Sequence, residues 1–362
     1  MPEPLLPEFR YAVDCCRWTR TPDQDRRLRE QAVDWPLFLR VARRHRIEGL
    51  VWRALRQAQV EVPAGVASGL RAAAERIGRD NLVAAAECAR LNSRFAAAAI
   101  PLLFVKGLTL SALAYGSALP KAGWDIDILI GEGDLPRAAL LLQADGYAMV
   151  VPHGPASPER VMAWHGRCKE SVWRHVGRGT HVELHTALSD HPMLLAGVGI
   201  DSPRQDVRVA EGIVLPTLRL EELFAYLTVH GASSAWFRLK WIADLAALLD
   251  GCSPEEIAAL YRRSQELGAG RAAALALLLL DRLFATPLAP PLLDSLHSDR
   301  ANRRLLGAAM RSMSGRAAAT ELDHLWLGTI WIHLAQFALL PGLRYKLVEL
   351  RRQARPLRRM PR

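Results

Sequence analysis

Two aspartates separated by one residue, Asp125 and Asp127, are the strongest candidates for chemistry in this 362-residue chain. They alternate with Ile126 and Ile128, and strict alternation places both carboxylates on one face of a β-strand. Adjacent carboxylates repel each other unless a cation lies between them, and Mg²⁺ prefers carboxylate oxygens while leaving positions for phosphate and water. The pattern indicates a metal site; the alternative for an isolated Asp-x-Asp is a solvated strand edge.

The segment before these aspartates has the features of a phosphate-binding turn. Residues 102–105 form an apolar run that predicts a short buried strand, and Lys106 and Gly107 interrupt it. A helical pattern follows over residues 108–115 and ends at Gly116, because glycine commonly follows the last helical residue. A glycine turn that leads into a helix N-terminus would offer backbone N–H groups to phosphates. The whole segment therefore has the parts of a metal–triphosphate site.

Two later segments carry further polar residues. His181, Glu183 and His185 alternate in the second strand of an expected β-hairpin, so their side chains face the same way. A zinc site formed by His181 and His185 is a weaker alternative, because no nearby ligand pair has metal spacing. Lys240 and Asp244 are four residues apart on an expected helix, which is close enough for an ordinary surface ion pair.

The order of these motifs resembles the nucleotidyltransferases of the polymerase-beta-type superfamily, and most closely a bacterial group described as uncharacterised nucleotidyltransferases. The resemblance covers roughly residues 30–250 and rests on several separated motifs, which are more specific together than any one alone. The residues that carry it are Lys106-Gly107, Tyr115-Gly116, Lys121, Asp125-Ile126-Asp127, Glu183-Leu184-His185, His230-Gly231, Trp236, Leu239-Lys240-Trp241 and Asp244.

The resemblance implies transfer of a nucleoside monophosphate from an NTP to an acceptor hydroxyl, with release of pyrophosphate by a two-metal mechanism. It implies that Asp125, Asp127 and Glu183 are catalytic and hold Mg²⁺, two ions in all. His185 would orient Glu183 or contact substrate. The residues expected to bind the nucleotide are Lys106, Gly107, Thr109, Lys121, His230 and Lys240.

The chain departs from the family pattern at two positions. Leu108 follows Gly107 where the superfamily usually has serine or glycine, so Thr109 is the nearest hydroxyl. Lys121 stands where the family usually has arginine in the approach to Asp-x-Asp. Lysine keeps the charge but lacks the two-pronged guanidinium. Both departures bear on phosphate affinity and leave the expected metal ligands in place.

The expected fold class is α+β, with a polymerase-beta-like nucleotidyltransferase core and a small mixed sheet flanked by helical units. We expect an N-terminal helical unit over residues 1–99, the core over residues 100–215, and a C-terminal helical domain with a basic tail over residues 216–362. Residues 1–23 contain four prolines and little periodicity, which predicts a loosely attached arm.

Composition narrows the class of protein. The five cysteines have no CxxC spacing, which argues against a zinc site or a disulfide framework. The first ten residues lack a basic-then-apolar signal pattern, so we expect a cytoplasmic protein. The net charge is +10, of which residues 342–362 carry +7. The apolar run over residues 325–340 is too short to span a bilayer, so a buried helix is favoured over membrane-surface contact by the tail.

Two other function classes remain open. One is a non-catalytic nucleotide-binding scaffold or regulatory partner protein, against which the retention of three acids argues. The other is a nucleic-acid-binding protein, which we rank last because the chain lacks a helix-turn-helix or interleaved aromatic and basic residues; no stable DNA binding is expected. The acceptor is open too: a small molecule, a peptide, a protein or a tRNA end would supply a hydroxyl.

Overall fold

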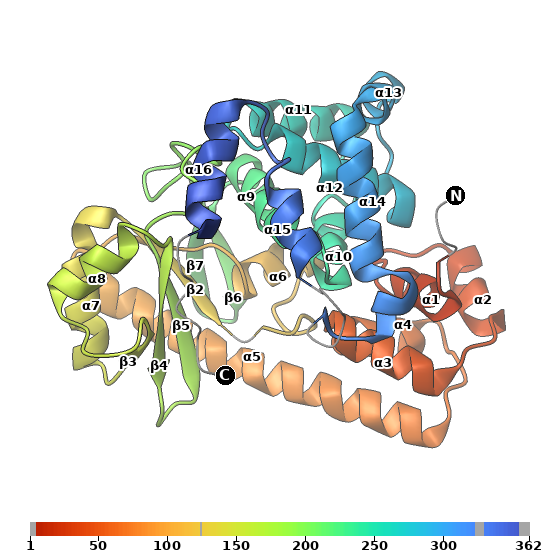
Figure 1. Ribbon diagram of the computed structural model, residues 1–362. Helices are drawn as coiled ribbons and strands as arrows, with labels where there is room; N and C mark the ends of the chain where they lie inside the picture. The colour runs from red at the N-terminus through yellow and green to blue at the C-terminus, as the bar shows by residue number, and fades with distance from the viewer. Residues whose placement is uncertain (1–4, 124, 323–328, 355–362) are drawn as a thin grey trace.

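The protein combines one mixed β-sheet with many helices, as the computed structural model in Figure 1 shows. The structure describes residues 5–123, 125–322 and 329–354. Trp124, the first part of the apolar run expected over residues 325–340, and the end of the basic tail lie outside the described residues. The expected α+β class with a small mixed sheet is confirmed.

Four short helices form the N-terminal part: α1 (Pro7–Cys15), α2 (Pro22–Glu30), α3 (Trp35–His45) and α4 (Glu48–Gln57). The expectation of a loose arm is wrong for α1, because Phe9 and Tyr11 are fully buried. Pro7 and Pro22 each lie in the first turn of a helix, where a missing N–H costs nothing. These prolines therefore begin helices and do not interrupt them.

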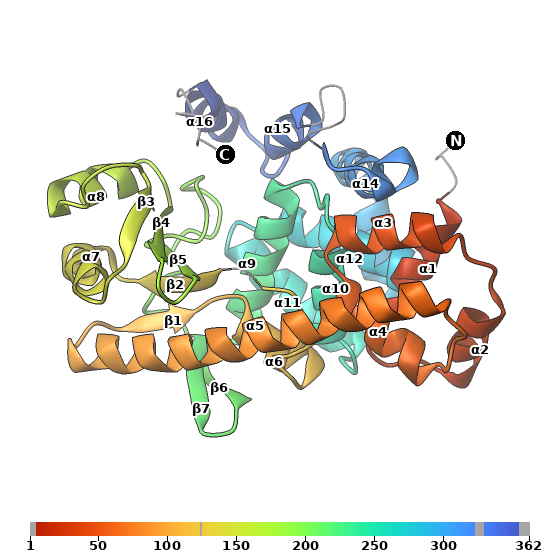
Figure 2. The same cartoon turned by 90° about the horizontal axis from the view of Figure 1, so that it is seen from below.

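Helix α5 (Ala64–Ala97) connects the N-terminal helices to the sheet. Its 34 residues correspond to about 50 Å at the α-helical rise. Near its start, Leu70 belongs to the core shared with α1–α4, whereas Leu91 and Phe95 belong to the core beneath the sheet. Figure 2 shows α5 running along one side of the molecule past α4, α6 and β1.

The sheet has five strands in the order β1-β2-β5-β4-β3. Only the central pair β2 and β5 is parallel, and the other neighbours are antiparallel. The expected hairpin is confirmed as β4 and β5. The strands are β1 (Leu102–Phe104), β2 (Ile126–Ile130), β3 (Ala148–Val151), β4 (Glu170–His175) and β5 (Thr180–His185).

The two faces of the sheet have different side chains because successive residues in a strand point in opposite directions. On one face, Ile126, Ile128 and Val182 pack with α5 and with α7 (Leu135–Ala144). On the other face, Asp127 and Glu183 stand directly side by side in the parallel pair. We call this second surface the carboxylate face.

Three helices and a short hairpin complete the middle of the chain. Helix α6 (Leu108–Tyr115) ends at Gly116, whose φ of 64° is in the left-handed region. Helix α8 (Pro158–His165) follows β3, and the single 3₁₀ turn Glu132–Asp134 precedes α7. Strands β6 (Arg204–Ala210) and β7 (Ile213–Leu218) form a separate two-stranded sheet that the sequence analysis did not anticipate.

The C-terminal part is helical, as expected. No helix in the described ranges is long and apolar enough to cross a membrane. The helices are α9 (Leu220–Ser233), α10 (Leu239–Leu248), α11 (Pro254–Glu266), α12 (Gly270–Phe284), α13 (Pro290–Ser298), α14 (Arg300–Met313), the 3₁₀ segment η2 (Gly315–Ala319), α15 (Ile330–Gln336) and α16 (Leu343–Ala354).

The hydrophobic core does not stop at the proposed unit boundaries. One cluster contains residues of α1, α3 and α4 together with α9, α10 and α12. A second cluster fills the space between the sheet, α5 and α7. The division at residues 99 and 215 remains a prediction, but packing joins the first and last parts of the chain around a shared interior.

Candidate functional site

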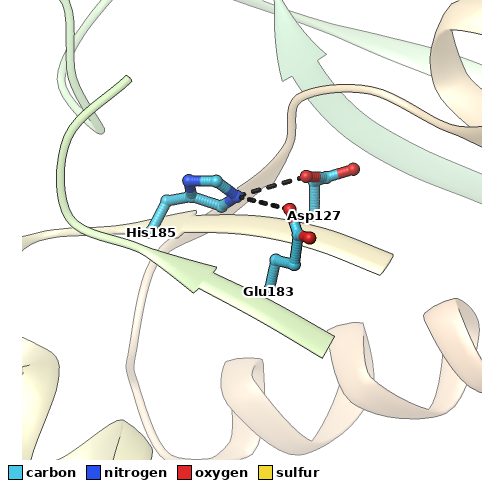
Figure 3. Close-up of side chains that lie close together, drawn as sticks. All are labelled: Asp127, Glu183 and His185. Atoms are coloured by element: carbon cyan, nitrogen blue, oxygen red, sulfur yellow. Dashed lines mark hydrogen bonds and ion pairs between the residues drawn. The ribbon is translucent and has the colours of Figure 1, made fainter. Parts of the chain in front are cut away.

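The centre of the site is formed by three side chains from β2 and β5. The parallel register pairs Asp127 with Glu183 and places His185 two residues further along the same face. Their ligand-type atoms all lie within 4.8 Å of one another. Figure 3 shows the three side chains pointing toward one another, with His185 Nε2 directed at both carboxylates. The sequence analysis expected Asp125, Asp127 and Glu183 as metal ligands and His185 as an orienting residue; the structure groups Asp127 and Glu183 with His185.

Lys106 lies beside these acids. Its Nζ is 2.7 Å from Asp127 Oδ1 and 3.8 Å from Glu183 Oε2. His185 Nε2 is 3.2 Å from the same Asp127 oxygen and 3.6 Å from Glu183 Oε2. The closest approaches of both partners fall on the same oxygen, Oδ1 of Asp127.

Burial and neighbouring charge give these groups different acidities. Burial alone would raise the pKa of Asp127, but Lys106 and His185 hold it well below its usual range. Burial raises the pKa of Glu183, and the charge of Asp127 adds to the rise. Burial would lower the pKa of His185, but hydrogen bonds with Asp127 and Glu183 raise it. Asp127 is therefore the permanent anion, and Glu183 is the more basic carboxylate.

Asp125 lies just outside the strand, since β2 begins at Ile126. It is exposed and lines the mouth of a cavity of about 430 Å³ that Lys106, Gly107 and Asp127 also line. Although the residue is exposed overall, the surrounding cavity walls partly desolvate its carboxyl and raise the pKa of Asp125, and the charge of Asp127 raises it further. The expected Asp-x-Asp pair is thus present, with one enclosed and one accessible carboxylate.

The Lys106-Gly107 turn has the geometry expected of a phosphate-binding turn. Gly107 precedes α6 with a φ of 64° and a ψ of −121°, a conformation that side chains strongly disfavour. The buried Thr109 hydroxyl lies 3.0 Å from the Phe104 carbonyl and 3.1 Å from the Lys106 carbonyl, so it holds the turn in place. No side chain caps α6, which leaves the N–H groups of its first turn available to a ligand.

Lys121 also lines the cavity, but its charge is already paired. Its Nζ lies 3.1 Å from Oδ2 of the buried Asp244 on α10. The Tyr115 hydroxyl donates to Oδ1 of the same carboxylate at 2.8 Å. The surface ion pair of Lys240 with Asp244, one of two alternatives that the spacing left open, is not found in the described part of the chain: Asp244 is buried and contacts Lys121 and Tyr115.

His230 and Lys240 approach the site from α9 and α10. The His230 ring packs edge-on against Trp241 with a centroid distance of 5.4 Å. Burial lowers the pKa of His230 well below its ordinary value, and Lys106 and Lys169 lower it further. Burial lowers the pKa of Lys240 to about 7, assisted by the charge of Lys121. Both side chains are electrostatically coupled to the carboxylates, but neither lines the cavity.

Three residues that sequence reasoning missed lie near this centre: Lys169, Glu170 and Tyr226. Glu170 Oε2 lies 3.2 Å from His185 Nδ1, and Lys169 forms an ion pair with Glu170. Counting back from the predicted hairpin turn would have placed Glu170 opposite His185. The Tyr226 hydroxyl is buried without a hydrogen-bond partner in the described part of the chain. The sequence did hold a signal for Tyr226: it precedes His230 by four residues, so the two side chains lie on the same helix face.

The comparison with protein families agrees with the resemblance to nucleotidyltransferases found in the sequence. A family model described as "Uncharacterised nucleotidyltransferase" matches residues 31–285, well over half of the chain. The chain belongs to this family. The matched range of the uncharacterised nucleotidyltransferase model contains every predicted site residue, from Lys106 to Lys240. A search of curated proteins found none that matches the chain.

Proposed function

We propose that the protein transfers a nucleoside monophosphate from an NTP to an acceptor hydroxyl and releases pyrophosphate. The observation that carries the proposal is the pairing of Asp127 with Glu183 on adjacent parallel strands, beside the Lys106-Gly107 turn. This is the arrangement that the resemblance to polymerase-beta-type nucleotidyltransferases implies. Family membership supports the reaction class.

The donor set fits Mg²⁺. Asp125, Asp127 and Glu183 together carry more negative charge than the one lysine between them neutralises, and their oxygens are the ligands that hard cations prefer. His185 would serve as a hydrogen-bond donor to the carboxylates because its pKa is raised. Bound Mg²⁺, two ions in our proposal, would offset phosphate charge and make the acceptor hydroxyl more acidic.

The protein's own side chains supply the remaining chemistry. Lys106 places a positive charge next to the turn, and the uncapped N–H groups of α6 would bind phosphate oxygens. In this proposal the electrostatic potential around the triphosphate also depends on three further residues, Lys121, His230 and Lys240. A carboxylate oxygen of Glu183 would accept the proton of the acceptor hydroxyl, because the raised pKa makes Glu183 the stronger base.

A second candidate function is nucleotide binding without catalysis, as in a scaffold or regulatory partner protein. The observation that favours it is the 2.7 Å ion pair of Lys106 with Asp127. The ammonium group already neutralises one of the carboxylates that are expected to bind the metal ion. Lys106 would have to share or leave Asp127 for a metal ion to bind. Turnover measurements separate the two functions.

The deciding experiment incubates the purified protein with each α-³²P-labelled NTP, Mg²⁺ and cell extract. We expect a labelled acceptor and an equal amount of pyrophosphate, both absent with the Asp127→Asn variant. The acceptor is then identified from the labelled fraction, which separates small molecules, peptides, proteins and tRNA. Nucleotide binding without label transfer in any extract would favour the non-catalytic function, and absence of NTP binding would contradict both.

A further inference from the structure

A cavity of about 430 Å³ opens at the end of the sheet, between α5 and the Lys106-Gly107 turn. Its volume is within the range of small-molecule sites. The residues that line it come from α5, α6, β7, the ends of β1, β2 and β5, and the turns beside them. The α5 side of the cavity and its surroundings include Asn81, Ala84, Cys88, Phe104 and Leu215.

The cavity connects two chemically different surfaces. Lys106, Gly107 and Asp127 belong to the candidate catalytic centre. Phe104 and Ile126, which line the same cavity, belong to the apolar core on the opposite side of the sheet. The cavity therefore extends from the carboxylate face around the strand ends to an apolar surface.

We propose that the α5 side of this cavity binds the nucleoside part of the NTP, with the triphosphate at the Lys106-Gly107 turn. This inference rests on the proposed function. A triphosphate needs cationic and N–H groups, whereas a nucleobase is a flat ring with two largely apolar faces. A base ring can pack against the apolar side chains of Ala84, Cys88, Phe104 and Leu215. Lys106, at the other side of the cavity, can neutralise the phosphates.

Asn81 on α5 adds a polar group to the apolar wall. It is 3 % exposed, and its side-chain Nδ2 donates to the carbonyls of Ala118, Leu119 and Lys121 at 2.8, 3.1 and 2.8 Å. Its Oδ1 accepts no hydrogen bond from the described residues. This oxygen is a fixed acceptor for an N–H group of the base or a hydroxyl of the ribose, since the amide is held by its own donors.

The test uses calorimetric titration of the full chain, in Mg²⁺, with the four common NTPs and with inorganic triphosphate. Ala84→Trp fills the cavity, and Ala86→Trp is the matched control because Ala86 is exposed on the same helix and does not line the cavity. We expect Ala84→Trp to weaken NTP binding at least about tenfold, the loss of a few apolar contacts, and to leave triphosphate binding unchanged. Ala84→Leu, a smaller addition, replaces it if the tryptophan variant does not fold.

Three outcomes overturn the inference in distinguishable ways. Equal affinity of the wild type for NTP and triphosphate would show that the nucleoside contributes nothing, while the proposed reaction stands. Unchanged NTP affinity of both Ala84 variants, with slower transfer, would assign the cavity to the acceptor. Failure of the wild type to bind either ligand would reject the proposed function together with the nucleoside site.

Discussion

Lys121 Nζ lies 3.1 Å from Oδ2 of Asp244, and this pair attaches the segment that precedes Asp125 to helix α10. The Tyr115 hydroxyl reaches the other oxygen of Asp244 from the end of α6. The Asp244 side chain is 3 % exposed and that of Lys121 is 11 % exposed, so water screens the pair poorly. Helix α6 and the segment that leads to the proposed metal ligands thus meet at one carboxylate.

Removal of that carboxylate should destabilise the fold. Asp244→Ala leaves the Lys121 ammonium and the Tyr115 hydroxyl without their acceptor, and breaking a buried pair from one side costs about 3–5 kcal/mol. Urea unfolding measures the loss. Lys121→Arg is the control: it keeps the ion pair, and its two-pronged charge should preserve or improve NTP affinity. An Asp244→Ala variant as stable as the wild type would contradict the structural role of the pair.

The carboxylates of the Asp-x-Asp pair should be essential for turnover. Asp125→Asn and Asp127→Asn keep the side-chain shape but remove the charge that would hold Mg²⁺, so each should abolish Mg²⁺-dependent transfer. Circular dichroism checks that the variants fold. Asp134→Asn is a control at an acid near the far end of β2, outside the cavity. If either variant keeps near wild-type turnover, the site has been assigned to the wrong residues.

Gly231 should be required for packing, not for catalysis. A Cβ atom at this position would lie 2.5 Å from ring atoms of the fully buried Trp236. Gly231→Ala should therefore cost about 1–3 kcal/mol, as other overpacked interiors do. In contrast, Gly78→Ala in α5 meets nothing within 4 Å and should gain about 0.5–1 kcal/mol. Thermal unfolding of the two variants should shift in opposite directions.

Removing the Tyr226 hydroxyl should increase stability and decrease activity. Its buried hydroxyl has no partner in the described ranges, and such a group costs about 1–3 kcal/mol. Tyr226→Phe should make the ligand-free protein more stable by about 1 kcal/mol. It should also slow turnover if the hydroxyl meets a bound ligand next to Lys106. Equal stability of the two proteins would mean that the hydroxyl is satisfied in solution.

The charge state of Lys240 should make stability depend on pH. Burial lowers the pKa of Lys240 from 10.5 to about 7. Between these two pH values the side chain is protonated in the unfolded chain and neutral in the folded one. Lys240 therefore destabilises the fold most below pH 7, and the penalty declines as the pH rises toward 10.5. Lys240→Met should be more stable than the wild type below pH 7, with a difference that shrinks at higher pH. A difference independent of pH would assign Lys240 an ordinary pKa.

Local patterns predicted the parts of the site that lie within single strands. Alternation in β2 and β5 identified Asp127, Glu183 and His185, because a period of two is visible in a few residues. Their approach across the sheet is a contact between residues far apart in the sequence, and only the resemblance to known nucleotidyltransferases implied it. The pairing of Lys121 with Asp244 is equally non-local. The i, i+4 spacing considers only neighbours on the same helix, so it indicated Lys240 as the partner of Asp244.

Other features were missed or misinterpreted in the sequence, for different reasons. The α5 wall of the cavity is built from residues such as Ala84 and Cys88, which look like any helix core until the sheet is placed beside them. Prolines near the N-terminus indicated a loose arm, although Pro7 and Pro22 begin helices. The β6–β7 hairpin did have a signal, since Val207 and Val209 alternate before a turn at Gly212.

Helix α5 connects the N-terminal helices to the candidate site. The same helix packs against α4 and, near its middle, forms the proposed nucleoside wall, where Asn81 also donates a hydrogen bond to the carbonyl of Lys121 in the segment leading to Asp125. A compound that wedges between α4 and α5 would displace that wall without resembling a nucleotide. If the nucleoside site lies where we propose, such a compound would inhibit the protein without competing with the NTP.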